Sequence, residues 1–175
     1  MRESDMRIGH GFDIHPLVAG RRLLLGGIEV ASAVGALGHS DADVVLHSLA
    51  DAILGALGLG DIGERFPDTD PRYKDADSSL LLGEVLAEAR KAGAAVVNAD
   101  VAIYLERPKL GPLKAHMRAS LARILGVEES RVGLKARTLE GLGPVGEGKA
   151  VAATAVVLLG FAARPGQKRE GARPA

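Results

Sequence analysis

The chain has 175 residues, and its 22 lysines and arginines balance 22 aspartates and glutamates, so its formal net charge is zero. Because aromatic residues make up only 3% of this neutral chain, it lacks the basic field and stacking side chains of a dedicated nucleic-acid-binding protein. The absence of cysteine excludes disulfides and thiolate metal ligands. The sequence has no run of about eighteen apolar residues, and its start lacks the apolar segment of a signal peptide. These features predict a cytoplasmic protein with no membrane partner.

Side-chain amides are scarce in the sequence. Asn98 is the only asparagine and Gln167 the only glutamine, while arginine outnumbers lysine. Heat-adapted proteins show the same scarcity of thermolabile residues, which favours a thermophilic source. A GC-rich genome produces much the same bias, so both explanations stay open.

The first third of the chain predicts a strand, a hairpin and a helix. Residues 7–17 form the expected strand, and residues 23–30 form a hairpin that turns at Gly26-Gly27. The helix is expected to run to about Leu57 and to be capped by Ser40, with Asp43 three residues later as in a capping box. Its buried stripe would comprise Leu46, Leu49, Ala50, Ile53 and Leu57, and its polar face Asp43, His47 and Asp51.

The rest of the chain alternates helices with strands. Residues 60–77 are rich in proline, glycine and aspartate without a period, which predicts a long functional or mobile loop. A second helix capped by Ser78 or Ser79 would run to Lys91 and be closed by Gly93. The remaining elements are strands at 96–105, 132–138 and 150–159 and a helix at 112–125. This order predicts an α/β or α+β sandwich with helices on one face of the sheet.

Asp13, His15 and His47 carry the strongest chemical signal. Asp13 and His15 are two residues apart on the predicted strand, so their side chains leave the same face. His47, on the following helix, would complete a set of two histidines and one carboxylate that leaves a fourth metal position open, as in catalytic zinc sites. A lone helical histidine is more often a hydrogen-bonded structural residue, but four of the five histidines fall in the first third of the chain. This clustering favours a metal site.

Longer motifs in the same regions resemble a known family. They are Ile8-Gly9-His10-Gly11-Phe12-Asp13-Ile14-His15, His39-Ser40-Asp41-Ala42-Asp43, Leu59-Gly60-Asp61-Ile62-Gly63 and Phe66-Pro67-Asp68-Thr69-Asp70-Pro71. In this order they are similar to the 2-C-methyl-D-erythritol 2,4-cyclodiphosphate synthases of the non-mevalonate isoprenoid pathway. The resemblance implies an α+β sandwich with a four-stranded mixed sheet, helices on one face, and a homotrimer with active sites between subunits. It also implies one synthase domain at residues 6–161, an extension at residues 1–5 and a disordered tail at residues 162–175.

The activity implied by the resemblance is that of a phosphorus–oxygen lyase. The substrate, 4-diphosphocytidyl-2-C-methyl-D-erythritol 2-phosphate, would cyclise to 2-C-methyl-D-erythritol 2,4-cyclodiphosphate with release of CMP. An anionic phosphate attacks an anionic phosphorus, so positioning and charge neutralisation should dominate catalysis. The family likeness places Zn²⁺ or another divalent metal at Asp13, His15 and His47, and Mg²⁺ or Mn²⁺ with the substrate diphosphate and Glu140.

Two rival functions stay open at this point. One is a metal-dependent phosphohydrolase, in which zinc activates water. The other is a non-catalytic nucleotide-binding trimer with structural zinc.

The resemblance further implies roles for residues that no local pattern singles out. His39 and Thr138 would be catalytic, as stabilisers of the transition state. Residues 61–63 would contact the methylerythritol part of the substrate, residues 66–70 would form a lid, and residues 105–111 with 136 and 137 would bind cytidine. The full implied substrate-binding set is Asp13, Ile14, His15, His39, Ser40, Asp61, Ile62, Gly63, Phe66, Pro67, Asp68, Thr69, Asp70, Leu105, Pro108, Lys109, Leu110, Gly111, Ala136, Arg137, Thr138, Leu139 and Glu140.

The sequence departs from the family pattern at two places. The loop at residues 142–148 is about two residues short and lacks the phenylalanine and arginine that line an isoprenoid-diphosphate cavity in other members, which predicts weak binding or none. Arg137 stands where a small hydroxyl residue is usual. Asp51, one turn after His47, is expected either to orient the His47 ring or to be a solvated carboxylate.

Overall fold

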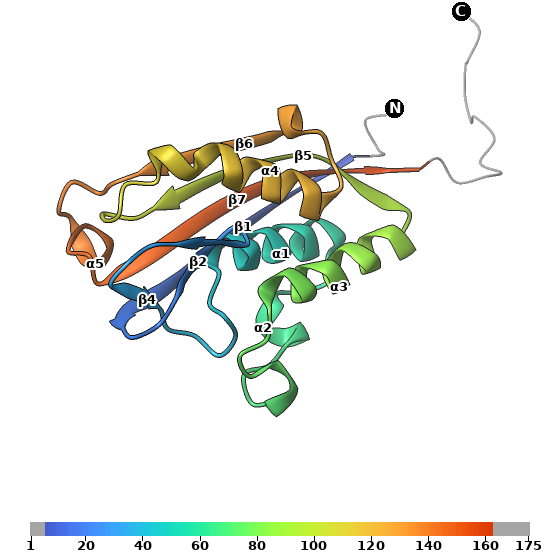
Figure 1. Cartoon of the computed structure of the whole chain (residues 1–175). Coiled ribbons are helices and arrows are strands. Elements are labelled where there is room, and N and C mark those ends of the chain that lie inside the picture. The colour runs from blue at the N-terminus through green and yellow to red at the C-terminus, as the bar shows by residue number, and fades with distance from the viewer. Residues whose placement is uncertain (1–5, 163–175) are drawn as a thin grey trace, which may run out of the picture.

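The computed structural model of the chain describes residues 6–162, which form a mixed five-stranded sheet with helices packed on one face (Figure 1). The strand order is β4-β1-β7-β5-β6, and all neighbouring pairs are antiparallel except β5 and β6. The strands are β1 (Met6–Ala19), β4 (Val34–Ala36), β5 (Ala94–Tyr104), β6 (Val132–Arg137) and β7 (Ala150–Phe161). The expected four-stranded sheet was therefore one strand short, because the three residues of β4 pair with the end of β1.

The predicted hairpin is confirmed as β2 (Leu23–Leu25) and β3 (Ile28–Val30), which pair as a separate two-stranded sheet. Gly26 and Gly27 form its turn with φ angles of 65° and 74°, a region that glycine enters without strain.

Three long helices, α1 (Val44–Leu57), α3 (Ser78–Lys91) and α4 (Lys114–Leu125), cover the same face of the sheet (Figure 1). Strand β7 shows the corresponding alternation. Val151, Ala153, Ala155, Val157 and Leu159 are buried, whereas Val156 on the opposite face is 42% exposed. The hydrophobic core therefore lies between the sheet and these helices.

Glycines in β1 let α1 lie directly on the strand backbone. A Cβ atom at Gly9 would stand 1.7 Å from the Ala52 carbonyl oxygen, and one at Gly11 would stand 2.0 Å from that of Ser48. Side chains at these two positions would force the helix away from the sheet. This close approach positions the first turn of α1, which carries His47, beside the middle of β1.

The cap of α1 differs from the expected one. Asp43, not Ser40, is the N-cap, and its carboxylate accepts from the backbone N–H groups of Val45 and Leu46. The same carboxylate accepts from Gly26 N at 2.9 Å and Gly27 N at 2.7 Å, so Asp43 is buried rather than part of a solvated polar face. One side chain thus joins the hairpin turn to the start of the helix.

The ends of α1 and α3 agree with the sequence only in part. Helix α1 ends at Leu57, as expected, and Gly58 closes it in the left-handed region. Helix α3 is capped by Asp77 rather than by Ser78 or Ser79, and its C-cap is Ala92, with Gly93 following at a φ of 78°.

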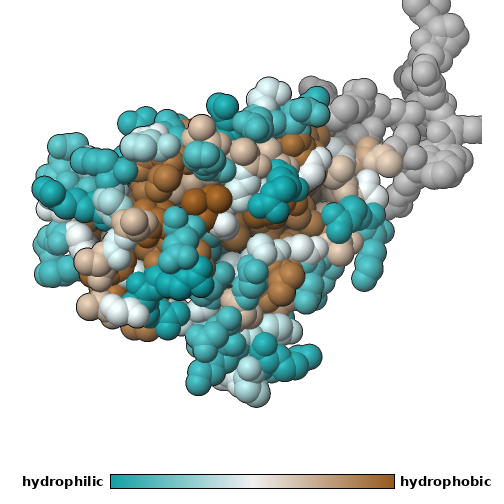
Figure 2. Space-filling model, in the orientation of Figure 1, coloured by the Kyte–Doolittle hydropathy of each residue, from teal (hydrophilic) through white to brown (hydrophobic). Residues whose placement is uncertain are grey.

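Residues 60–77 are not the structureless loop that the sequence predicts. They contain α2 (Ile62–Arg65) and the 3-10 turn η2 (Pro71–Tyr73), whose first turns are capped by Asp61 and Asp70. This segment projects from the body of the molecule, and its surface is mainly hydrophilic (Figures 1 and 2). The remaining short elements are η3 (Gly111–Leu113), η4 (Glu129–Arg131) and α5 (Gly143–Gly146).

The expected extension at residues 1–5 and the tail beyond residue 162 lie outside the described residues. Among the residues that are described, no helix combines the length and the apolar character needed to cross a bilayer.

Candidate active site

Asp13, His15 and His47 come together as the sequence predicts. Asp13 Oδ2 lies 2.9 Å from His47 Nδ1 and 3.1 Å from His15 Nε2, and the two ring nitrogens are 3.2 Å apart. Asp13 and His15 leave the helix-covered face of β1, and His47 reaches them from the first turn of α1. Each of the three residues offers a ligand atom within 4.8 Å of the others. The arrangement supplies two imidazole nitrogens and a carboxylate oxygen, which suits a divalent cation.

The charges of the site also suit a cation. Burial by itself would raise the pKa of Asp13, but hydrogen bonds with His15 and His47 outweigh it and hold the pKa well below its usual range. Burial lowers the pKa of His47, whereas its hydrogen bond to Asp13 and the Asp13 charge raise it, and the net shift is upward. The carboxylate is therefore ionised, and the position between it and the two rings favours positive charge.

A cavity of about 440 Å³, which we call the metal cleft, opens beside the three residues. Its wall includes His39 and Ser40, which precede α1, and Phe66, Pro67 and Asp68 from the projecting segment. The full lining is Asp13, His15, His39, Ser40, His47, Ile62, Gly63, Phe66, Pro67, Asp68, Tyr73 and Leu81. The structure thus gathers the expected metal ligands, one expected catalytic residue and part of the expected lid around one space.

Four other expected substrate-binding residues do not line the metal cleft. Asp61 caps α2 by accepting from Glu64 N at 2.8 Å, and Asp70 caps η2 while its carbonyl oxygen lies 3.4 Å from His39 Nε2. Thr69 is exposed. Ile14 points to the helix-free face of the sheet, where it lines another cavity, so within one chain its side chain does not join the metal cleft.

Among the described residues no hydrogen bond joins Asp51 to His47, so the expected orienting role is not supported. Asp51 is half-buried, and its Oδ1 accepts from Ile62 N at 2.8 Å, which fixes the start of α2. Burial raises the pKa of Asp51, and the hydrogen bond from Ile62 opposes that rise.

The two segments expected to bind cytidine lie side by side, because β5 and β6 are parallel and end at the same edge of the sheet. Leu105 N donates to Arg137 O at 3.0 Å across this edge. Ala136 and Gly111 belong to the same two segments, and Leu105 and Leu110 are buried. Pro108 and Lys109 line a second cavity of about 850 Å³. Among the described residues, this cavity shares no lining residue with the metal cleft.

Thr138 and Glu140 lie just beyond β6 on a turn. The Thr138 hydroxyl donates to Glu140 Oε1 at 2.6 Å, and Glu140 adopts a φ of 52° before Gly141. Leu139, between them, faces the helix-free side with Ile14. Glu140, the expected ligand of Mg²⁺ or Mn²⁺, therefore lies next to Thr138, the second expected catalytic residue. Neither residue lines the metal cleft of the same chain.

Sequence reasoning did not identify Ser78 and Asp41 as supports for the outer side of the His47 ring. His47 Nε2 lies 2.9 Å from Ser78 Oγ and 3.0 Å from Ser40 Oγ, and Ser78 in turn contacts Asp41. Asp41 stands in the motif at residues 39–43, which was a usable signal. Ser78 lies 31 residues from His47 along the chain, and its serine-rich surroundings indicate only a helix cap.

The fold and site define a class: α+β sandwiches with a candidate metal site of two histidines and one carboxylate beside a cleft. The chain belongs to the YgbB family, whose model matches residues 6–160. The expected resemblance is confirmed by relatives named 2-C-methyl-D-erythritol 2,4-cyclodiphosphate synthase. The Geobacillus kaustophilus enzyme is 58% identical over 87% of this chain and 97% of its own length, and the Geobacter metallireducens enzyme is 56% identical over 88% and 98%.

Solved structures agree with these relatives. A 2C-methyl-D-erythritol-2,4-cyclodiphosphate synthase in a CDP-bound form has a TM-score of 0.82 and 46% identity over 87% of this chain and 99% of its own. The Plasmodium falciparum IspF in complex with CDP has a TM-score of 0.80 and 32% identity over 93% and 100%.

Proposed function

We propose that this protein cyclises 4-diphosphocytidyl-2-C-methyl-D-erythritol 2-phosphate to 2-C-methyl-D-erythritol 2,4-cyclodiphosphate with release of CMP. The observation that carries the proposal is the meeting of Asp13, His15 and His47 beside a cavity that His39 and Ser40 also line. Relatives that match nearly the whole chain have the corresponding name, and two similar structures hold CDP. The reaction class is that of a phosphorus–oxygen lyase.

Asp13, His15 and His47 would hold a divalent metal, which we propose to be zinc. When bound there, the metal supplies a Lewis acid for a diphosphate oxygen. The protein's own contribution is to fix the donor atoms before substrate arrives, because β1 and α1 are in direct backbone contact at Gly11.

His39 and the lid residues are assigned to substrate positioning. His39 Nε2 lies 3.4 Å from Asp70 O, which holds the ring against the lid at the wall of the cavity that a phosphate would enter. Phe66 packs edge-to-face against Tyr73 at 5.2 Å, which supports the lid from below. We assign the methylerythritol part of the substrate to this wall.

The segments after β5 and β6 are proposed to bind the cytidine end. Backbone groups of residues 105–111 can read the edge of the base, and Lys109 can offset phosphate charge. Thr138 and Glu140 are proposed to act on the diphosphate, with Glu140 as a ligand for Mg²⁺ or Mn²⁺. Their turn offers both oxygens at one place, since Thr138 donates to Glu140.

We propose a homotrimer in which the metal cleft of one subunit faces the cytidine segments of its neighbour. The helix-free face of the sheet supports this assembly. Ile8 is 72% exposed and Phe12 51%, and Ile14 and Val156 are exposed beside them. Exposed apolar side chains gathered on one face of a sheet favour burial against another copy.

Phosphorus NMR after incubation with the substrate and divalent metal tests the activity. Cyclic diphosphate with CMP is the expected result. Free inorganic phosphate would indicate the rival phosphohydrolase, and unchanged substrate would indicate a nucleotide-binding protein. Sedimentation equilibrium tests the trimer, and a monomer at micromolar concentration would contradict it.

A further inference from the structure

Ser78 and Asp41 form a chain of contacts that ends on the outer nitrogen of His47. Ser78 Oγ lies 2.9 Å from His47 Nε2 and also contacts Asp41 Oδ1. Ser78 N donates to the other Asp41 oxygen at 3.1 Å. His47 and Ser78 are 9% and 1% exposed, so bulk water has little access to this contact.

The positions of the protons follow from the donors and acceptors present. The Ser78 hydroxyl donates to Asp41 Oδ1, so its single proton points to Asp41. Ser78 Oγ then faces His47 with a lone pair, which assigns the proton between them to His47 Nε2, and Ser40 Oγ, 3.0 Å from the same nitrogen, can share that proton as a second acceptor. A neutral imidazole protonated at Nε2 has its lone pair at Nδ1. Nδ1 is the His47 atom that lies 2.9 Å from Asp13, so a metal held by Asp13 and Nδ1 would replace the proton that the two atoms share in the metal-free chain.

The backbone around this chain of contacts is tied at two further points. Asp41 N donates to Ala76 O at 3.0 Å, and Asp75 N donates to His39 O at 2.8 Å. The segment before α1 is thereby joined to the segment before α3. These hydrogen bonds keep Ser78 and Asp41 in register with each other and anchor the end of the projecting segment.

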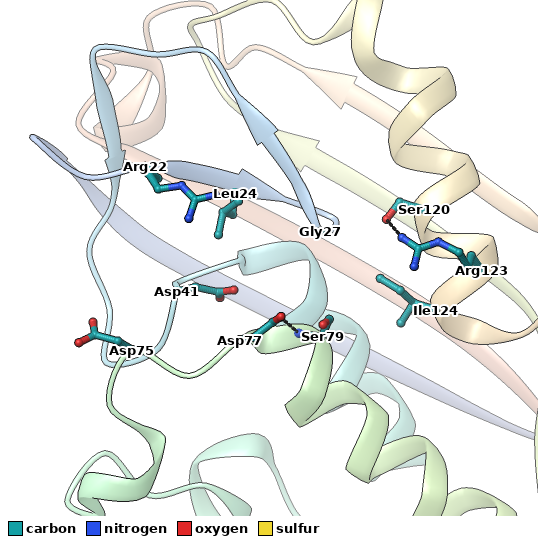
Figure 3. A pocket seen from close by; sticks show the side chains of 10 residues that line it. All are labelled: Arg22, Leu24, Gly27, Asp41, Asp75, Asp77, Ser79, Ser120, Arg123 and Ile124. Atoms are coloured by element: carbon teal, nitrogen blue, oxygen red, sulfur yellow. Dashed lines mark hydrogen bonds between the residues drawn. The ribbon is translucent and has the colours of Figure 1, made fainter.

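Asp41 also borders another cavity of about 370 Å³, called the outer cavity below, which shares no lining residue with the metal cleft (Figure 3). Asp77 and Ser79 line the same cavity, and Asp77 caps α3 by accepting from Ser79 N at 2.8 Å. The role of helix cap is therefore filled by Asp77, and Ser79 faces the outer cavity. Ser78, between them, is the residue turned inward to His47, so capping does not account for its hydroxyl.

We propose that Ser78 and Asp41 are positioning residues that hold His47 in the tautomer and orientation needed for Nδ1 to bind the metal. The inference rests on the metal site of the proposed function. Partners of the non-ligating nitrogen of a metal-bound histidine change metal affinity by about 10–100-fold when removed.

The test measures cobalt binding and the visible absorption of the bound cobalt, using the full chain prepared free of metal. Ser78→Ala should bind Co²⁺ about 10–100-fold more weakly and change the absorption bands, because the His47 ring is no longer fixed. Ser79→Ala is the matched control on the same helical turn, and its affinity should stay within about twofold of wild type.

A double-mutant cycle tests whether Asp41 acts on His47 through Ser78 or whether the two residues affect metal binding independently. Asp41→Asn should weaken Co²⁺ binding in the wild-type chain but have little further effect in the Ser78→Ala chain, because Asp41 acts through Ser78. Asp77→Asn is the control for loss of a nearby charge, because Asp77 is the N-cap of α3, and it should leave the cobalt spectrum unchanged.

Wild-type affinity and spectrum in Ser78→Ala would overturn the inference while leaving the proposed function intact. If the losses of Co²⁺ affinity in Asp41→Asn and Ser78→Ala are fully additive, the inference that Asp41 acts through Ser78 is overturned. If the wild-type chain and a His47→Ala chain bind Co²⁺ equally, the proposed metal site fails and the inference fails with it.

Discussion

In the metal cleft, side chains from β1 and α1 are fixed by buried contacts within one chain, whereas the segments after β5 and β6 present their expected binding residues on open turns. His47 has partners at both ring nitrogens. Lys109 and Arg137, by contrast, are exposed. In the proposed homotrimer, the first region would be complete after folding, and the second would need a neighbouring subunit to complete it. A site divided in this way is sensitive to single substitutions in the first region and to assembly in the second.

The largest effect is expected from His47→Ala. Two remaining ligands rarely hold zinc in an open site, so metal content and cyclisation should fall by more than about 100-fold. Metal analysis of the purified variant and phosphorus NMR of the reaction measure the two losses. His116→Ala, which removes an exposed histidine from α4, is the control and should match wild type. Full zinc content with wild-type turnover in His47→Ala would remove this residue from the site.

Mixed trimers test whether the two regions face each other across subunits. His47→Ala and Lys109→Ala chains, each inactive alone, should regain activity after joint unfolding and reassembly. If each site takes one region from each neighbour, about a quarter of the sites in random trimers combine two intact regions. Turnover of the mixture is the measurement, and it requires that Lys109→Ala by itself is strongly impaired. Proven mixed trimers without recovery would place both regions in one subunit.

A smaller effect is expected from Gly11→Ala, which acts on the packing beneath the metal cleft. The new Cβ would meet the Ser48 carbonyl oxygen at 2.0 Å, so α1 must shift, at a cost of about 1–3 kcal/mol in the free energy of unfolding. Metal affinity should fall with it, since the shift moves His47 away from Asp13. Denaturant unfolding and cobalt titration measure the two changes.

Gly55→Ala is the control for this substitution, because its Cβ meets nothing within 4 Å. Alanine inside α1 should stabilise the protein by about 0.5–1 kcal/mol without changing metal affinity. Equal stability of Gly11→Ala and wild type would show that the helix tolerates a larger distance from β1.

The smallest signal is expected from isoprenoid diphosphates. The cavity of about 330 Å³ on the helix-free face is lined by ten uncharged residues, including Phe12 and Leu142. Lys149, which could have supplied positive charge, pairs with Glu147 at 2.7 Å. Calorimetric titration with geranyl diphosphate should give little or no heat, because a diphosphate needs cationic donors. Tight binding of one molecule per trimer would contradict this expectation.

Local periodicity was enough to predict most elements and the core of the site. Residues two apart on a strand share a face, which correctly placed Asp13 with His15. The helical pattern correctly predicted that α1 ends near Leu57. The family motifs grouped His39 with the candidate metal ligands, and these residues line one cavity.

The errors arose where contacts between distant segments decide the local structure. Asp43 rather than Ser40 caps α1, and its additional donors, Gly26 and Gly27, lie 17 and 16 residues earlier in the chain. Strand β4 is too short to show a pattern and is defined only by pairing with β1. The turns α2 and η2 depend on aspartate caps within a segment that has no apolar period.

The buried carboxylate of Asp43 has a consequence for substrate affinity. It fixes one end of residues 39–43 to the hairpin turn, while Asp41 fixes their middle to the start of α3. The conformational entropy of these residues is therefore lost when the chain folds, and substrate binding does not have to order them again. More of the interaction free energy between phosphate and protein is then expressed as affinity, and the association rate is not limited by rearrangement of this segment.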